Sequence, residues 1–145
     1  MIGVLVIVSL AAAACGGSSK ESDSADASTG GSDETQVEAL IRGFSDRTQA
    51  LDADGSYALL CDSLQKKSDL KQIRQNMEGY KNVGNAAPKI SDLKFSNVTT
   101  NGSSGEARYS YTQVFRGETK TINEGVTVAK EQGKWCIKDQ LAVDN

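Results

Sequence analysis

The chain has 145 residues and contains no histidine, so its chemistry has to come from other side chains. Histidine is the most common general base in enzymes and the most common side-chain metal ligand. Its absence excludes Ser-His and Cys-His nucleophile pairs and the histidine-bearing classes of zinc site. What remains is a set of three cysteines, four tyrosines and one unusually placed glutamate. We therefore predict no catalytic residue, no metal and no cofactor.

Glu124 is the unusual glutamate, because it lies among apolar side chains in a stretch that alternates like a β-strand. Ile122, Val126 and Val128 share its alternation. If Glu124 is buried, its pKa rises, and its carboxylate can accept a proton or bind a polar group of a ligand. The interpretation that we favour is that Gly125 introduces a β-bulge, which shifts the register and leaves Glu124 in solvent.

Cys15 follows an apolar run, residues 2–14, that ends in small side chains. The run has the length of a signal-peptide core and is too short to span a bilayer, which needs about 20 apolar residues. The stretch 9–17 resembles a bacterial lipobox, where a diacylglyceryl group is attached to the cysteine and the precursor is cut just before it. The resemblance implies that residues 1–14 are a lipoprotein signal peptide. Cys15 would then anchor the protein to the extracytoplasmic face of the cell membrane; a secretory signal without lipid and a buried helix are the alternatives.

The other two cysteines, Cys61 and Cys136, form an even pair in a domain that is predicted to be exported. Disulfides persist outside the cytosol, so we predict a disulfide between them, with two buried free thiols as the alternative. Cys61 falls on the apolar face of a predicted helix, so Cys136 is expected to face the helices. Trp135 and Ile137 would then point to the opposite face of their strand. Either that outer face is partly covered, for example by a partner, or the strand twists through a bulge; an exposed Trp135 and Ile137 pair is a candidate interaction surface.

Residues 15–33 form a predicted flexible linker between the lipid and the domain. The segment consists almost entirely of Gly, Ser, Asp, Ala and Thr, so it cannot bury enough apolar surface to fold. Its one lysine and four acidic residues give a net charge of −3, which equals the net charge of the whole chain. The domain, residues 34–145, is therefore formally neutral. Since nucleic-acid-binding domains carry a basic patch, we expect no nucleic-acid partner.

The first half of the domain has the apolar period of helices, and the second half has the period of strands. We predict helices from Ser32 or Asp33 to residue 51, from a Ser56 cap to residue 67, and from Ser68 to about Gly84. After Pro88, strands are predicted over 93–98, 107–115, 122–128 and 135–138, joined by glycine-containing turns. This order predicts an α+β fold, with three N-terminal helices packed on a four-stranded antiparallel sheet.

The order of elements resembles the NTF2-like superfamily, in which a curved sheet wraps around an N-terminal helix to form a cone with an internal pocket. The long first helix and the motifs 57–61 (YALLC) and 134–137 (KWCI) resemble in particular the DUF4878, or lumazine-binding-like, domain of small actinobacterial lipoproteins. The resemblance implies a pocket inside the cone. Its candidate lining residues are Tyr57, Tyr109, Tyr111 and Glu124.

Three functions are compatible with these features, and we favour them in the order given. The first is a membrane-anchored, non-catalytic module that binds a small apolar or amphipathic ligand in the pocket. The second is a scaffold that contacts another cell-envelope protein through Trp135 and Ile137. The third is a small isomerase or dehydratase of the cone type. A buried Glu124 beside a tyrosine would favour the enzyme, and an exposed Trp135 would favour the scaffold.

Overall fold

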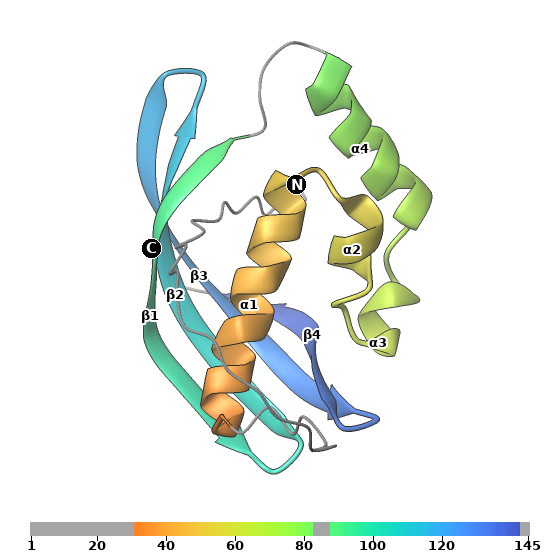
Figure 1. The fold of residues 1–145 in the computed structure, drawn as a ribbon, viewed down its shortest axis with the longest axis vertical. Helices are drawn as coiled ribbons and strands as arrows, with labels where there is room; N and C mark the ends of the chain where they lie inside the picture. The colour runs from red at the N-terminus through yellow and green to blue at the C-terminus, as the bar shows by residue number, and fades with distance from the viewer. Residues whose placement is uncertain (1–30, 83–87, 143–145) are drawn as a thin grey trace, which may run out of the picture.

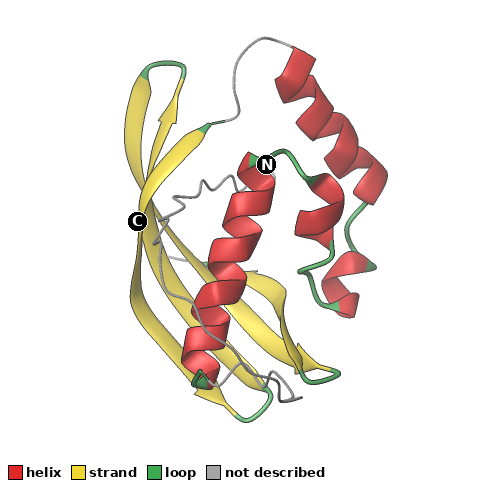
Figure 2. Ribbon diagram, in the orientation of Figure 1, coloured by secondary structure: helices red, strands yellow, loops and turns green. Residues whose placement is uncertain are grey.

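The computed structural model describes residues 31–82 and 88–142. The signal peptide, Cys15 and nearly all of the linker that the sequence predicts lie outside the described residues. A curved sheet forms one side of the domain, one long helix crosses its concave face, and the shorter helices lie beyond that helix (Figures 1 and 2). Within the described ranges, no helix is long and apolar enough to cross a membrane.

Four helices precede the sheet in the described part of the chain. They are α1 (Asp33–Gln49), α2 (Ala53–Tyr57), α3 (Asp62–Gln65) and α4 (Leu70–Asn82). Ser32 is the N-cap of α1, as the sequence predicts, and its hydroxyl accepts a hydrogen bond from the backbone N–H of Thr35 at 3.4 Å. The predicted end of the last helix, Gly84, lies outside the described residues.

The sheet is the predicted antiparallel meander. Its strands are β1 (Lys89–Asn101), β2 (Ser104–Phe115), β3 (Glu118–Glu131) and β4 (Lys134–Leu141), in the order β1-β2-β3-β4. Two-residue turns, Arg116–Gly117 and Gln132–Gly133, join the last three strands, and φ is positive at both residues of each turn, between 51° and 83°. Such turns match the right-handed twist of the strands that they connect, which is why they specify hairpins.

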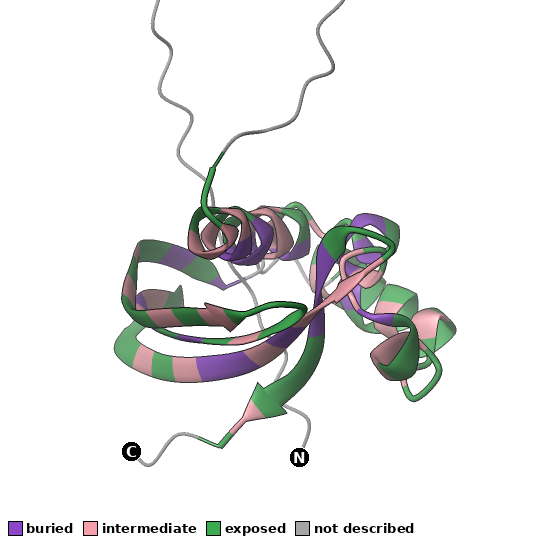
Figure 3. Cartoon of the chain, turned by 90° about the horizontal axis from the view of Figure 1, so that it is seen from below, coloured by how far each residue is buried: buried purple, intermediate pink, exposed green. Residues whose placement is uncertain are grey.

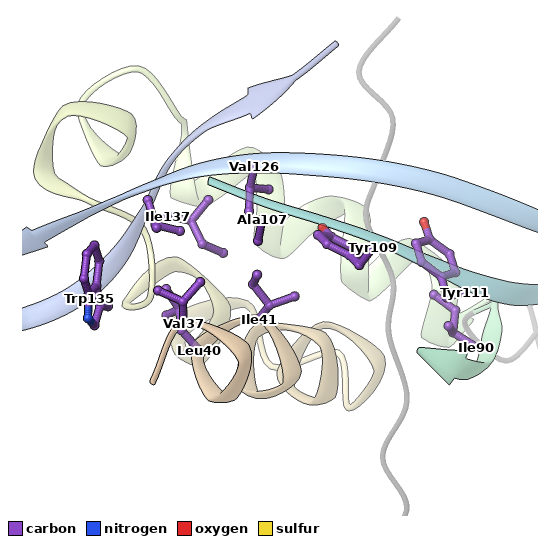
Figure 4. Packing of buried hydrophobic residues seen from close by; sticks show 11 residues of the cluster. Val37, Leu40, Ile41, Ile90, Ala107, Tyr109, Tyr111, Val126, Trp135 and Ile137 are labelled. Atoms are coloured by element: carbon purple, nitrogen blue, oxygen red, sulfur yellow. The ribbon is translucent and has the colours of Figure 1, made fainter. Parts of the chain in front are cut away.

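The core lies between α1 and the concave face of the sheet. Buried residues alternate with exposed ones along β2, as expected for a sheet with one face on a core (Figure 3). Val37 and Ile41 of α1 are almost completely buried and point toward the strands (Figure 4). The buried apolar cluster consists of Val37, Leu40, Ile41, Ile90, Ala107, Tyr109, Tyr111, Val126, Val128, Trp135 and Ile137.

Two carboxylates in the first turn of α1 attach the helix to strands near both edges of the sheet, β1 at one edge and β3 and β4 at the other. Asp33 accepts hydrogen bonds from Lys130 Nζ at 2.7 Å and from the indole Nε1 of Trp135 at 3.2 Å. Glu34 accepts a hydrogen bond from the hydroxyl of Thr100 in β1. These bonds lower the pKa of both carboxyl groups. Asp33, the last residue of the predicted linker, is thus the first residue of α1.

The predicted helix from Ser56 to residue 67 is wrong, because the structure divides it into α2 and α3. Asp52 caps α2 and accepts from the backbone N–H of Gly55 at 2.9 Å. Between the two helices Cys61 is extended, and Leu60 forms a parallel bridge with Ile137. Backbone hydrogen bonds join Cys61 N to Ile137 O (2.8 Å) and Ile137 N to Leu59 O (2.9 Å). This segment therefore lies along the edge of β4.

Cys61 and Cys136 are joined by a disulfide, with their Cα atoms 4.9 Å apart. Because Cys61 lies beside the edge of β4 rather than beneath it, the disulfide does not require Trp135 and Ile137 to face solvent. The candidate interaction surface is therefore wrong, whereas a register shift, the other alternative, does interrupt the pairing of β4 with β3. Trp135 and Ile137 are only 8 % and 5 % exposed, and both belong to the core cluster that packs against α1.

Candidate functional site

Glu124 is an acidic side chain on the concave face of the sheet, and two tyrosines bond to it. Glu124 in β3 lies directly opposite Tyr109 in β2. The hydroxyl of Tyr109 donates to Glu124 Oε2 at 3.2 Å, and the hydroxyl of Tyr111 donates to Oε1 at 3.1 Å. Each oxygen of the carboxylate thus accepts one phenolic hydrogen bond. We call Tyr109, Tyr111 and Glu124 the tyrosine–glutamate cluster.

The favoured prediction for Glu124, a solvated side chain displaced by a bulge at Gly125, is wrong. The pairing of β2 with β3 runs without a register shift, so Glu124 keeps the same face as Val126 and Val128. The irregularity of β3 lies instead between Thr127 and Val128, in its pairing with β4. A residue that alternates with core positions in an unbroken ladder has to face the core.

Gly125 serves close packing rather than a bulge. A Cβ atom at this position would lie 3.1 Å from Cβ of Leu141 and 3.4 Å from the carbonyl oxygen of Ala107. The missing side chain therefore allows the end of β4 to approach β3 closely. This packing explains why a glycine stands beside Glu124 in a regular strand.

The surroundings of Glu124 disfavour its charge. Burial raises the pKa of the Glu124 carboxyl, while the hydrogen bonds from Tyr111 and Tyr109 act in the opposite direction. The pKa values of both tyrosines are raised, first by burial and then by the neighbouring Glu124. Both phenols therefore remain protonated donors, and the carboxyl is the group in the cluster whose pKa is shifted toward neutrality.

An aromatic row continues from the cluster toward the edge of the sheet. The rings of Tyr109 and Tyr111 are stacked at 6.4 Å between centroids, and Phe95 of β1 lies 6.0 Å from Tyr109. Arg42 of α1 places its guanidinium 5.0 Å from the centre of the Phe95 ring. Both tyrosines extend from β2 on the side of the sheet that faces α1 (Figure 4). The concave face thus combines a row of packed aromatic rings with the Glu124 carboxyl.

The structure brings together three of the four predicted lining residues and separates the fourth. Tyr57 lies in α2, where its hydroxyl donates to the backbone carbonyl of Gln65 at 2.8 Å. This bond closes the turn between α2 and α3, so Tyr57 has a structural role. Phe95 and Arg42 were not among the predicted site residues, because neither stands out from the ordinary pattern of its strand or helix.

The hollows found in the described part of the chain lie away from the cluster, whose two tyrosines are buried in the core. One of about 350 Å³ lies near the β1–β2 hairpin, beside Thr99, Glu106 and Lys138. Another, of about 290 Å³, lies between the α2–α3 segment and the β3–β4 turn. It includes Cys136, and the ligand atoms of Cys61, Cys136 and Glu131 lie within 4.8 Å of one another. Because the two sulfurs are bonded to each other, they offer no thiolate to a metal ion.

The comparisons with known proteins bear on the fold alone. No family model and no curated protein sequence matches the chain. Solved structures do match. An NTF2-like protein of unknown function from Shewanella oneidensis is 11 % identical, with a TM-score of 0.57 over 72 % of this chain and 94 % of that one. The fold is NTF2-like.

Two further solved structures have a similar fold. An NTF2-like protein of unknown function from Pseudomonas putida has a TM-score of 0.55 at 12 % identity, over 77 % of this chain and 87 % of the other. A SEC-C motif containing protein from Rhodopseudomonas palustris has a TM-score of 0.62 at 20 % identity, over 77 % and 81 %. At these identities the likeness concerns the fold, so the function has to be argued from the residues of this chain.

Proposed function

We propose that this chain is a lipid-anchored extracytoplasmic protein whose NTF2-like domain binds a small ligand on the concave face of its sheet, without catalysing a reaction. One observation carries the proposal: a half-buried carboxyl, Glu124, is held between two tyrosine hydroxyls on that face. A buried ionisable group destabilises the free protein unless it is compensated, so its presence points to a role in binding.

The chemistry of the cluster favours a ligand with an amine or another hydrogen-bond donor at one end. Glu124 accepts hydrogen bonds, and a cation beside it would offset the cost of burying its charge. Phe95, which is half-buried beside Tyr109, offers apolar and cation–π contacts to the rest of such a ligand, while the rings of Tyr109 and Tyr111 are only 2 % and 3 % exposed and pack in the core. The ligand class is therefore a small amphipathic amine.

The same hydrogen bonds favour binding over catalysis. An enzyme of the cone type needs a base and separate donors for the developing oxyanion. In this protein, the hydroxyls of Tyr109 and Tyr111 both donate to Glu124, so the cluster holds the carboxylate instead of offering free donors to a substrate. The scaffold alternative loses its proposed surface, because Trp135 and Ile137 are buried.

Calorimetric titration with octylamine and with octanoate tests the ligand class. These probes share an apolar chain and differ in the charge of the head group. We expect the wild type to bind octylamine at least about tenfold more tightly than octanoate, and Glu124→Gln to remove that preference, because one buried charge-assisted bond is worth about 1.5–3 kcal/mol. Glu106→Gln is the matched control. Glu106 is an exposed glutamate of β2, and it lies on the face of the sheet opposite to the buried Ala107. Equal affinities of wild type and Glu124→Gln for octylamine would refute the ligand class.

The proposed anchor has a separate test, the intact mass of protein purified from its own membrane. We expect the mass of a chain that begins at Cys15 and carries a diacylglyceryl group. Cys15→Ser should release the domain from the membrane without changing its melting temperature, because the anchor precedes the folded residues. An unlipidated mass that includes residues 1–14 would contradict the anchor while leaving the ligand site untouched.

A further inference from the structure

Two polar side-chain atoms of α1 are buried and lack a hydrogen-bond partner among the described residues. They are Ser45 Oγ and Gln49 Nε2. Ser45 is 0 % exposed, so water at the surface does not satisfy its hydroxyl. Thr48, on the same helix, behaves differently, because its hydroxyl donates to the carbonyl oxygen of Phe44 at 2.8 Å.

The contacts of α1 show which way these two side chains face. Arg42 reaches Phe95, and Glu34 bonds to Thr100, so that side of the helix faces β1. The opposite side carries Asp33, which bonds to Lys130 and Trp135 of β3 and β4.

Ser45 and Gln49 follow Ile41 at intervals of four residues, which places all three along one helical row. Since successive members of such a row rotate by about 40°, Ser45 and Gln49 lie between the direction of Ile41 and that of Arg42. Ile41 points toward the sheet beside Tyr109 (Figure 4). Ser45 and Gln49 therefore face the β1–β2 side of the same concave surface that carries the tyrosine–glutamate cluster.

Buried polar atoms without a partner are energetically unfavourable. More than about 90 % of buried polar groups in proteins are hydrogen-bonded, and leaving one unsatisfied costs about 1–3 kcal/mol. A serine hydroxyl in a helix can donate to the carbonyl oxygen four residues earlier. Thr48 makes the corresponding bond to Phe44, whereas the Ser45 hydroxyl makes no hydrogen bond. Two donors left open on one face of α1 point to a partner that is not among the described residues.

We infer that Ser45 and Gln49 are the second polar contact of the ligand, and that they donate hydrogen bonds to an acceptor oxygen. The inference rests on the proposed function and adds to it the other end of the ligand. Glu124 binds a donor, while the Ser45 hydroxyl and the Gln49 amide bind an acceptor. The ligand is then an amphipathic molecule with an amine at one end and a carbonyl or amide oxygen at the other.

A series of ω-amino amides of increasing chain length tests this inference, each compared with the alkylamine of the same length. Calorimetric titration of the wild type should show one length at which the amide binds about tenfold more tightly than the amine, the effect of one or two additional buried hydrogen bonds. Ser45→Ala should remove this amide preference and leave the affinity for the alkylamine unchanged. Gln49→Leu is expected to do the same, and it provides a second variant if the first one does not fold.

Thr48→Val is the matched control, because the hydroxyl of Thr48 is already used within the helix. It should keep the amide preference. The inference is wrong if no amide binds more tightly than its amine, or if Ser45→Ala and Gln49→Leu both keep the preference. In either case the alkylamine titrations still report on Glu124, so a failure of this inference is distinct from a failure of the proposed ligand class.

Discussion

Replacing Cys61 with serine is expected to lower the free energy of unfolding by about 4 kcal/mol. The disulfide joins residues 75 apart in the sequence, and closing a loop of this length removes much of the conformational entropy of the unfolded chain. It also holds the α2–α3 segment against the edge of β4, where the backbones of Cys61 and Ile137 are hydrogen-bonded. The cost is large compared with the total stability of a small domain.

Urea unfolding under oxidising conditions measures this effect. Cys136→Ser and the double variant should lose as much stability as Cys61→Ser, because each removes the same bond. Wild-type protein treated with a phosphine reductant should match the double variant. If the oxidised wild type and Cys61→Ser unfold at the same urea concentration, the disulfide does not stabilise this domain.

Trp135→Ala is expected to cost about 3–5 kcal/mol, the usual range for removing a large aromatic side chain from a core. The ring lies in the cluster between α1 and the sheet, and its indole N–H donates to Asp33. Lys130 lies over the same ring, with its Nζ 5.2 Å from the ring centre. The substitution therefore removes apolar contacts and disturbs the hydrogen bonds that fix the start of α1.

Trp135→Phe separates the two contributions. It keeps most of the apolar contact and loses the bond to Asp33, so we expect a loss of about 1 kcal/mol. Unfolding should be followed by circular dichroism, because Trp135 is the only tryptophan. A change of less than about 0.5 kcal/mol in Trp135→Ala would be typical of a surface position and would restore the interaction-surface hypothesis.

The sheet was predictable because its pattern is local. Alternating residues in 107–115 and 122–128, separated by glycine turns, specify paired strands wherever one face is buried. The break between α2 and α3 was not predictable, because Cys61 is extended by its pairing with Ile137, which is distant in sequence. A helical apolar period describes that segment equally well until the tertiary contact is known.

The candidate site was predicted in part. The sequence singled out Glu124, Tyr109 and Tyr111, and the structure brings the three together. The face of Glu124 was mispredicted because a glycine in a strand indicates either a bulge or a close approach, and the partner that decides, Leu141, is known only from the fold.

The Cys61–Cys136 pair was predicted correctly, but the faces of its neighbours were not. The prediction assumed that the disulfide crosses from a helix to the face of β4. It runs sideways from the edge of that strand instead, which leaves the inner face to Trp135 and Ile137. The open donors of Ser45 and Gln49 have no sequence signature, because only the packing of α1 shows that they lack partners.

The most direct test of the account is a carbon-detected NMR titration of the Glu124 carboxyl, with and without octylamine. In the free protein we expect the pKa of Glu124 to lie above its ordinary value, because burial disfavours the charged form. Octylamine should lower this pKa, since a cation bound beside the carboxylate stabilises its charge, and by linkage the amine should bind more tightly as Glu124 ionises. A Glu124 pKa in the ordinary range that octylamine does not change would contradict the proposed site.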